Sequence, residues 1–221
     1  MKKIISFSLW GRNPLYLRGA IENVYLQQEF FNDWICRFYV DDSVPSEIIN
    51  ELKRNNCEIV YKSKSKKLIG LMWRFEVAFD DIDVERYIVR DADSRLTLRE
   101  KVCVDEWISS GLAFHIIRDH PNHTHPIMGG MWGGIPSALP EFKRLYKWYN
   151  LWSNGKFWTD MTFLKKRIWP RIQNNHLAHD EFHKFTLKEV PFTIKRTDNF
   201  DFVGNKFDEN NNPVYQIETS I

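Results

Sequence analysis

The chain has 221 residues, 43% of them hydrophobic, which is enough for one domain with a single large core. Its 31 lysines and arginines nearly balance 29 aspartates and glutamates, so overall charge gives no basis for binding nucleic acid or an acidic membrane. The sequence contains no apolar run near the roughly 20 residues of a membrane-spanning helix. The three cysteines are widely spaced, which is typical of reduced thiols in a cytoplasmic protein.

The first 118 residues predict alternating strands and helices. In chain order we expect a strand over 4–9, a helix over 14–31, a strand over 34–40, a helix over 45–55, a strand over 57–61, a basic loop over 62–67, a helix that contains 71–79, a strand over 87–89, a helix over 97–111 and a strand over 113–117. Repeated β-α-β units favour an α/β fold with a mostly parallel sheet, flanked by helices and joined by right-handed crossovers.

The remaining residues are less regular. A glycine-rich run occupies 128–134, where glycine permits either a tight bend or close approach of the backbone to a ligand. An amphipathic helix is expected over 139–152, packed on the sheet rather than on a membrane. A shorter helix over 160–167 should stop before Trp169-Pro170. The tail beyond 190 should fray at its asparagine-rich end.

The strongest chemical signal is a pair of carboxylates, Asp91 and Asp93, directly after the expected strand over 87–89. In an open α/β sheet ligands bind beyond the carboxyl ends of the strands, so both side chains should project into a cleft. There they repel each other unless a cation neutralises them, and hard oxygen ligands favour Mg²⁺ or Mn²⁺ together with a diphosphate. The same spacing also occurs in solvated turns. The preceding strand and the arginines at 90 and 95 favour a metal–nucleotide site.

Two further segments could contact a nucleotide. Residues 8–12 lie at the carboxyl end of the first expected strand, where they form either a nucleotide-binding edge or an ordinary strand–helix turn. The chain lacks the glycine-rich motifs of dinucleotide-binding folds and of P-loop enzymes. Arg74 could hold a diphosphate through its guanidinium, or it could pair with Glu76 or Glu85 on the surface.

Two more residues could serve catalysis or bind a metal. Asp160 heads a short expected helix, where it is either a first-turn acid or a general base in the cleft. His179 could occupy a metal position left open by two aspartates, or it could be a core histidine. The histidines over 120–125 lack partners at zinc-site spacing and are interpreted as incidental.

In their order along the chain, these motifs resemble those of metal-dependent glycosyltransferases of the GT-A fold. The resemblance is greatest to small members from bacteria and from large DNA viruses, including chlorella viruses, that act on capsid and surface glycans. It covers most of residues 3–183. The residues that carry it are 4–11, 34–39 with Asp41-Asp42, 72–75, 90–95, 128–134, Thr159-Asp160, 163–164, 168–170 and His179-Asp180.

The resemblance implies transfer of a sugar from a nucleoside diphosphate sugar, most often a UDP-sugar, to a hydroxyl of a glycan or glycoprotein acceptor. It implies Mn²⁺ or Mg²⁺ held by Asp91, Asp93 and His179. If the reaction inverts the anomeric carbon, the acceptor hydroxyl needs a base, and Asp160 is the candidate for that catalytic role. Many members have glutamine where this chain has Met161, a difference that concerns the donor sugar. The donor-binding residues that it implies are Ser8, Leu9, Trp10, Arg74, Arg90, Asp91, Ala92 and Asp93.

The resemblance also gives an expected organisation. We expect one domain over 1–221, in which 1–118 form the nucleotide-binding half and 119–221 the acceptor-side half. No repeat or linker divides the sequence.

Two other functions remain open from the sequence. Haloacid-dehalogenase-type phosphatases also place Asp-x-Asp after a strand and use the first aspartate as nucleophile. They usually carry threonine or valine where this chain has Arg95, and their motif opens the domain. A catalytically inactive nucleotide- or carbohydrate-binding module would keep Asp91 and Asp93 without turnover. An aspartyl-phosphate mimic trapped at Asp91 would indicate the phosphatase, and the absence of turnover with any donor would indicate the binding module.

Overall fold

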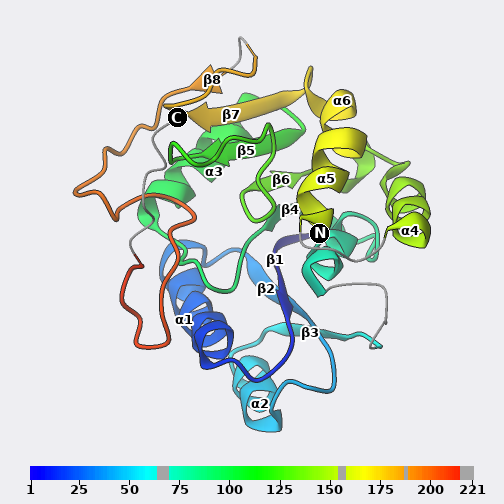
Figure 1. Ribbon diagram of the computed structural model, residues 1–221, viewed down its shortest axis with the longest axis vertical. Coiled ribbons are helices and arrows are strands. Elements are labelled where there is room, and N and C mark those ends of the chain that lie inside the picture. Colours follow the sequence, from blue (N-terminus) through cyan, green and yellow to red (C-terminus); the bar gives the residue numbers. More distant parts are fainter. Residues whose placement is uncertain (64–69, 154–157, 187–188, 215–221) are drawn as a thin grey trace.

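The computed structural model describes residues 1–63, 70–153, 158–186 and 189–214, and most of the basic loop expected over 62–67 lies outside them. The chain forms one α/β domain around an eight-stranded sheet (Figure 1). The strands are β1 (Lys2–Leu9), β2 (Ile35–Val40), β3 (Glu58–Tyr61), β4 (Val84–Val89), β5 (Phe114–Arg118), β6 (Trp132–Gly134), β7 (His176–Asp180) and β8 (Glu189–Val190). The helices are α1 (Pro14–Phe30), α2 (Ser46–Arg54), η1 (Gly70–Ala78), α3 (Leu98–Ser110), η2 (Pro136–Ala138), α4 (Phe142–Trp152), α5 (Thr159–Phe163), η3 (Leu164–Ile168) and α6 (Trp169–Ile172).

The sheet is mostly parallel, as the alternating pattern predicts. Its order is β3-β2-β1-β4-β6-β5-β7-β8, and β6 runs antiparallel to both of its neighbours. The chain runs outward from β1 through β2 to β3 and then returns to place β4 on the other side of β1. This reversal makes the carboxyl ends of β1 and β4 the switch point of the sheet, where ligands bind in open α/β folds.

Both faces of the sheet are buried, which explains the continuous apolar strands. In β1, Ile4 packs in one core with residues of η1, α4 and α5, whereas Ile5 packs in another with residues of α1, α2 and α3.

Local signals fix the helix ends. Asn13 caps α1 by accepting a hydrogen bond from the Leu15 amide at 3.1 Å, and Pro14 opens the helix. The three cysteines are buried and unpaired.

Two helix predictions need correction. The helix expected over 71–79 is present, but η1 is a 3₁₀ helix. The helix expected to stop before Trp169-Pro170 continues through α5, a π-helical turn in η3 and α6. A π-helical turn shifts the backbone hydrogen bonds, and Pro170 then falls in the first turn of α6, where its missing N–H needs no partner.

The tail beyond 190 packs onto the domain, so the expected fraying is wrong for the described residues up to 214. Its anchor is Asp119, which is fully buried and accepts hydrogen bonds from Arg99 at 2.7 and 2.8 Å. From the tail, Arg196 donates to the same carboxylate at 3.0 Å and the Val203 amide at 2.9 Å. Lys206 then forms a β-bridge with Ser94, beside the Asp91–Asp93 turn.

Candidate active site

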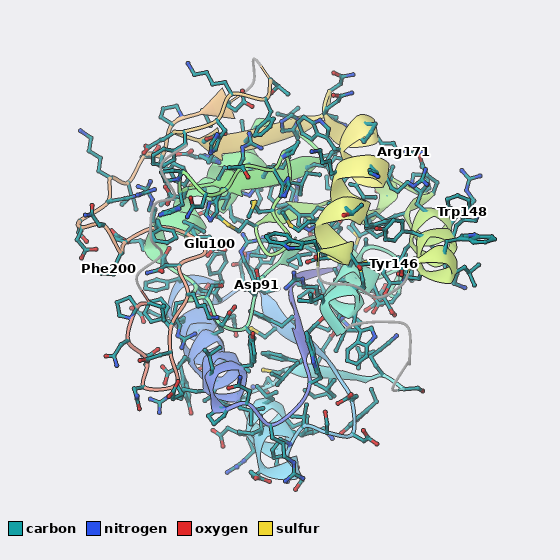
Figure 2. All side chains as sticks on the ribbon, viewed as in Figure 1. Asp91, Glu100, Tyr146, Trp148, Arg171 and Phe200 are labelled. Carbon is teal, nitrogen blue, oxygen red and sulfur yellow. The ribbon has the colours of Figure 1, made fainter. Side chains whose placement is uncertain are left out.

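Two neighbouring cavities open at the switch point of the sheet. The first, of about 190 Å³, is lined by residues 8–13, which include the end of β1, and by residues 91–93 after β4. The second, of about 410 Å³, extends toward the glycine-rich run and α5. Both are lined by Tyr16, Leu71, Arg74, Asp91 and Asp93, so these residues lie where the cavities meet. Figure 2 shows Asp91 near the middle of the molecule, between the helices of the two faces.

Arg74 links two carboxylates of the site. Its side chain is 4% exposed, and its guanidinium donates to Asp91 Oδ1 through Nη1 and to Asp160 Oδ2 through Nη2 at 3.0 Å. The backbone of Arg74 is fixed by two serines of β1: Ser6 Oγ donates to its carbonyl at 2.7 Å, and its amide donates to Ser8 Oγ at 2.9 Å. The remaining guanidinium donor, Nε, has no partner in the described structure. Arg74 is therefore held rigidly and keeps hydrogen-bonding capacity for a ligand.

Asp160 is buried at the start of α5. Its Oδ1 accepts a hydrogen bond from the Met161 amide at 2.8 Å, while its Oδ2 faces Arg74. The helix is preceded by Trp158, whose φ of 72° lies in the left-handed region that a bulky residue rarely adopts. Such conformations concentrate at functional sites, because the surrounding structure must enforce them. The backbone thus turns sharply to place Asp160 in the cavity.

Asp91 and Asp93 share the turn after β4. Burial, followed by the charge of Asp91, raises the pKa of Asp93 to about 6. Arg74 pairs with Asp91, and the cation nearest to Asp93 is Lys206 of the tail, whose Nζ lies 3.7 Å from Asp93 Oδ2. Because Arg74 also pairs with Asp160, three carboxylates face two cations here, and a bound cation would relieve the excess negative charge.

The glycine-rich run packs directly on these side chains. A Cβ on Gly130 would lie 1.9 Å from Asp91 Oδ2, and one on Gly129 would lie 2.7 Å from Asp160 Oδ2. Contacts shorter than about 3 Å cannot be accommodated without a shift of the site, so both positions require glycine for close approach. The structure shows both roles considered for this run: 129–130 form a turn before β6, and this turn packs closely against the side chains of the site.

Most of the predicted donor-binding residues come together here. Ser8, Leu9, Trp10, Arg74, Asp91, Ala92 and Asp93 all line the first cavity. Trp10 and Tyr16 are each 37% exposed, so both present an aromatic surface on which a base can stack. The hydroxyl of Ser8 is used by the Arg74 backbone, which makes Ser8 a positioning residue in this structure.

His179 and Arg90 lie elsewhere, and both expectations need correction. His179 is fully buried in β7, where Nδ1 faces His115 at 2.9 Å and Nε2 faces Glu106 at 2.7 Å. Both ring nitrogens are thus engaged away from the aspartates, and the residue lines neither cavity. Arg90 points to the other side of β4, where it pairs with the buried Glu100. The alternation of side chains along a strand explains this, because Arg90 precedes Asp91 by one residue.

Several residues that line the cavities were not predicted from the sequence. Tyr16 from α1, His123 from the loop after β5 and Lys206 from the tail line the cavities. His123 is buried and accepts from the Asp119 amide at 3.0 Å, and burial lowers its pKa to about 3, so it is neutral. Because the donor is the backbone amide of residue 119, the residue type at that position does not predict this bond. Nothing in the sequence around Lys206 indicates its position.

The donor set fits a hard divalent cation. Mg²⁺ and Mn²⁺ are commonly held by one or two carboxylates, with substrate phosphates and water completing the shell. Asp91 and Asp93 would supply those carboxylates, and burial together with the charge of Asp91 raises the pKa of Asp93 to about 6. Within the described ranges, no cluster of three or more histidine, cysteine or acidic ligands forms.

Comparisons with known proteins give the fold. No protein-family model and no curated protein sequence matches the chain. A glycosyltransferase involved in glycosylation of the major capsid of PBCV-1 matches with a TM-score of 0.50 at 15% identity, over 81% of this chain and 82% of that one. The chain has a GT-A-like α/β fold.

No helix in the part of the chain that the structure describes combines the length and apolar character needed to traverse a bilayer.

Two nucleotidyltransferases share this fold to a similar degree. A candidate glucose-1-phosphate thymidylyltransferase from Bacillus anthracis has a TM-score of 0.53 at 12% identity, over 82% of this chain and 87% of that one. A 4-diphosphocytidyl-2C-methyl-D-erythritol synthase from Anaerococcus prevotii has a TM-score of 0.50 at 11% identity, over 88% and 91%. At such identities the likeness concerns the fold, so the chemistry must be argued from the site.

Proposed function

We propose that the protein is a glycosyltransferase that moves a sugar from a nucleoside diphosphate sugar to a hydroxyl of a glycan or glycoprotein acceptor, with Mn²⁺ or Mg²⁺ bound by Asp91 and Asp93. The observation that supports it most is the convergence of three carboxylates, those of Asp91, Asp93 and Asp160, around the buried Arg74 in one cavity at the switch point. A uridine nucleotide is proposed on the strength of the resemblance in the sequence.

The cavity suggests how a donor would lie. The base and ribose would occupy the first cavity, against Trp10 or Tyr16, and the diphosphate would lie at Arg74 where the cavities meet. The sugar would then face Gly129 and Asp160 in the second cavity. This arrangement supports the division into a nucleotide half over 1–118 and an acceptor half over 119–221, with one exception: Lys206 from the second half reaches the diphosphate side.

In the proposed reaction, residues of the site would stabilise negative charge on the leaving diphosphate and accept the proton of the acceptor hydroxyl. The diphosphate leaving group gains negative charge in the transition state, and a metal ion bound there would stabilise it as a Lewis acid. Arg74 would stabilise the same charge through its guanidinium. A phosphate oxygen that replaces Asp160 on Nη2 would release Oδ2, which then could accept the proton of the acceptor hydroxyl. Trp158 and Met161 would limit the access of water to the donor.

The test is turnover with a panel of UDP- and GDP-sugars, following release of the nucleoside diphosphate with Mn²⁺ and with EDTA. The proposal expects slow metal-dependent hydrolysis by the wild type that Asp93→Ala abolishes. Asp83→Ala, which removes an exposed carboxylate away from the cavities, is the matched control and should retain the rate. Absence of turnover with every donor would favour a binding module. Trapping of a beryllofluoride adduct on Asp91 would favour a phosphatase.

Nucleotidyl transfer is a second candidate, because two of the structural neighbours carry it on the same fold. It would join a sugar phosphate to a nucleoside triphosphate and release pyrophosphate. Incubation with UTP, CTP or dTTP and a panel of sugar phosphates separates the two functions, since only nucleotidyl transfer yields pyrophosphate.

A further inference from the structure

The helix α4 has a second apolar surface that faces away from the domain. Its inner side packs Phe142 and Tyr146 into the core, which confirms the expected packing on the sheet. Its outer side leaves Trp148, Leu151 and Trp152 at 52%, 72% and 75% exposure. Figure 2 shows Trp148 at the edge of the molecule, projecting away from the sheet. Contiguous exposure of large apolar side chains on one helix side marks an interaction surface.

Basic residues surround this apolar surface. On α4 itself, Lys143, Arg144 and Lys147 are exposed. At 100° per residue, Lys143 and Lys147 border Leu151 on one side, and Trp148 and Trp152 lie on the other. We call these six residues the α4 face: Lys143, Arg144, Lys147, Trp148, Leu151 and Trp152.

The neighbouring turn extends the positive charge. Arg167 of η3 lies over the Trp148 ring at 4.9 Å, so η3 and α4 are side by side, and Lys165 and Lys166 of η3 are exposed. Residues 142–172 contain eight lysines and arginines and one acid, the buried Asp160. The stretch thus carries +7 in a chain whose net charge is +2, so positive charge is concentrated here while the remainder is acidic.

We infer that the α4 face docks the protein onto an anionic lipid bilayer. Tryptophan and leucine between lysines and arginines are the composition of helices that lie in the membrane interface, where apolar side chains enter the acyl boundary and cations meet lipid headgroups. A nucleic acid would use the cations but leave Leu151 and Trp152 exposed. The net charge of the whole chain is near zero, so it does not reveal that this one face is strongly positive.

Docking in this way would orient the candidate site. Trp158, which is 55% exposed, lines the second cavity together with Asp160 and follows α4 in the chain. A bilayer under α4 would therefore lie near the mouth of the acceptor side. An acceptor held in that membrane would reach the cavity without leaving the lipid surface, a consequence that rests on the proposed function. The docking itself does not, because it requires no nucleotide.

The test is sedimentation of the full-length protein with vesicles of phosphatidylcholine alone and of phosphatidylcholine with phosphatidylglycerol, at 50 and 300 mM NaCl. We expect binding to the anionic vesicles that weakens with salt and little binding to the neutral ones. Lys143→Gln with Lys147→Gln should lower the partition coefficient about 30-fold, because each basic residue at such a surface contributes roughly fivefold. Leu151→Ser with Trp152→Ser should lower it at least about tenfold.

Matched controls carry the same changes away from the α4 face. Lys53→Gln with Arg54→Gln removes two charges from α2, which lies apart from α4 in Figure 1, and Tyr61→Ser with Ile82→Ser removes exposed apolar groups. Both control proteins should bind vesicles like the wild type, and all variants should keep the wild-type unfolding midpoint. No binding to anionic vesicles, or equal loss in the control variants, would overturn the inference. So would a wild-type dimer in sedimentation velocity that the α4 variants dissociate, since the face would then be a contact between two copies.

Discussion

Arg74 forms one ion pair with Asp91 and another with Asp160, and the two pairs differ in exposure, which allows a quantitative prediction. The Asp160 side chain is 8% exposed, whereas that of Asp91 is 40% exposed. Removal of one partner of a buried pair costs about 3–5 kcal/mol, since the other charge stays buried and unpaired. An exposed pair contributes about 1 kcal/mol or less, because water screens it. Most of the stability lost in Arg74→Met should therefore come from the loss of the ion pair with Asp160.

Double-mutant cycles measure the coupling energy of each ion pair separately. Arg74→Met is combined with Asp160→Asn in one cycle and with Asp91→Asn in the other. Free energies of unfolding are determined in urea at pH 7 with EDTA, with the slope checked for constancy. We expect a coupling of about 2–3 kcal/mol with Asp160, as for buried charged hydrogen bonds, and about 1 kcal/mol or less with Asp91. Equal couplings, or a larger one with Asp91, would refute the reasoning from burial.

Three other predictions concern single residues. Gly130→Ala should abolish Mn²⁺-dependent nucleotide binding in calorimetry, because its Cβ would lie 1.9 Å from Asp91 Oδ2; unchanged affinity would contradict this. Asp93→Asn should raise the free energy of unfolding at pH 7 by up to about 3 kcal/mol, because the raised pKa of about 6 makes the charged form costly in the folded state. The gain should shrink as the pH falls below 6, and urea unfolding at pH 7 and 5 checks it. His123, with its pKa lowered to about 3, should make the protein lose about 2 kcal/mol between pH 7 and 5, because the unfolded chain takes up the proton first. His123→Asn should remove that loss in the same urea titrations, and an unaltered pH dependence would count against neutral burial.

The sequence predicted the parts of the fold that depend on local patterns. The strands β1, β2 and β4 and the helices α1 and α2 appear within a few residues of their expected limits, because apolar periodicity, Pro14 and capping residues determine them. The strand β7 was missed, since its sequence around His179 contains too few β-branched residues to stand out. The π-helical turn before Pro170 was also missed, because it depends on packing of Leu164 and Ile168 in the core.

The site was predictable where chain order alone brings residues together. Asp91, Asp93 and residues 8–10 end adjacent parallel strands, so the topology places them at one edge. Arg74 was predicted as a phosphate contact, but its bridge to Asp160 depends on contacts across 86 positions of sequence. Lys206 reaches the site only because Asp119 holds the tail, a long-range interaction that no local pattern reports.

The central claim is that Asp91 and Asp93 bind a divalent cation together with a nucleoside diphosphate. Isothermal titration of UDP, GDP and ADP into the wild type and into Asp91→Asn, each with Mn²⁺ and with EDTA, tests it most directly. We expect the wild type to bind UDP only with Mn²⁺ and Asp91→Asn not to bind it, although that variant should remain folded by circular dichroism. Equal affinity with and without Mn²⁺, or the same affinity in Asp91→Asn, would contradict the metal role of the pair. Absence of binding by every nucleotide would contradict the proposed function itself.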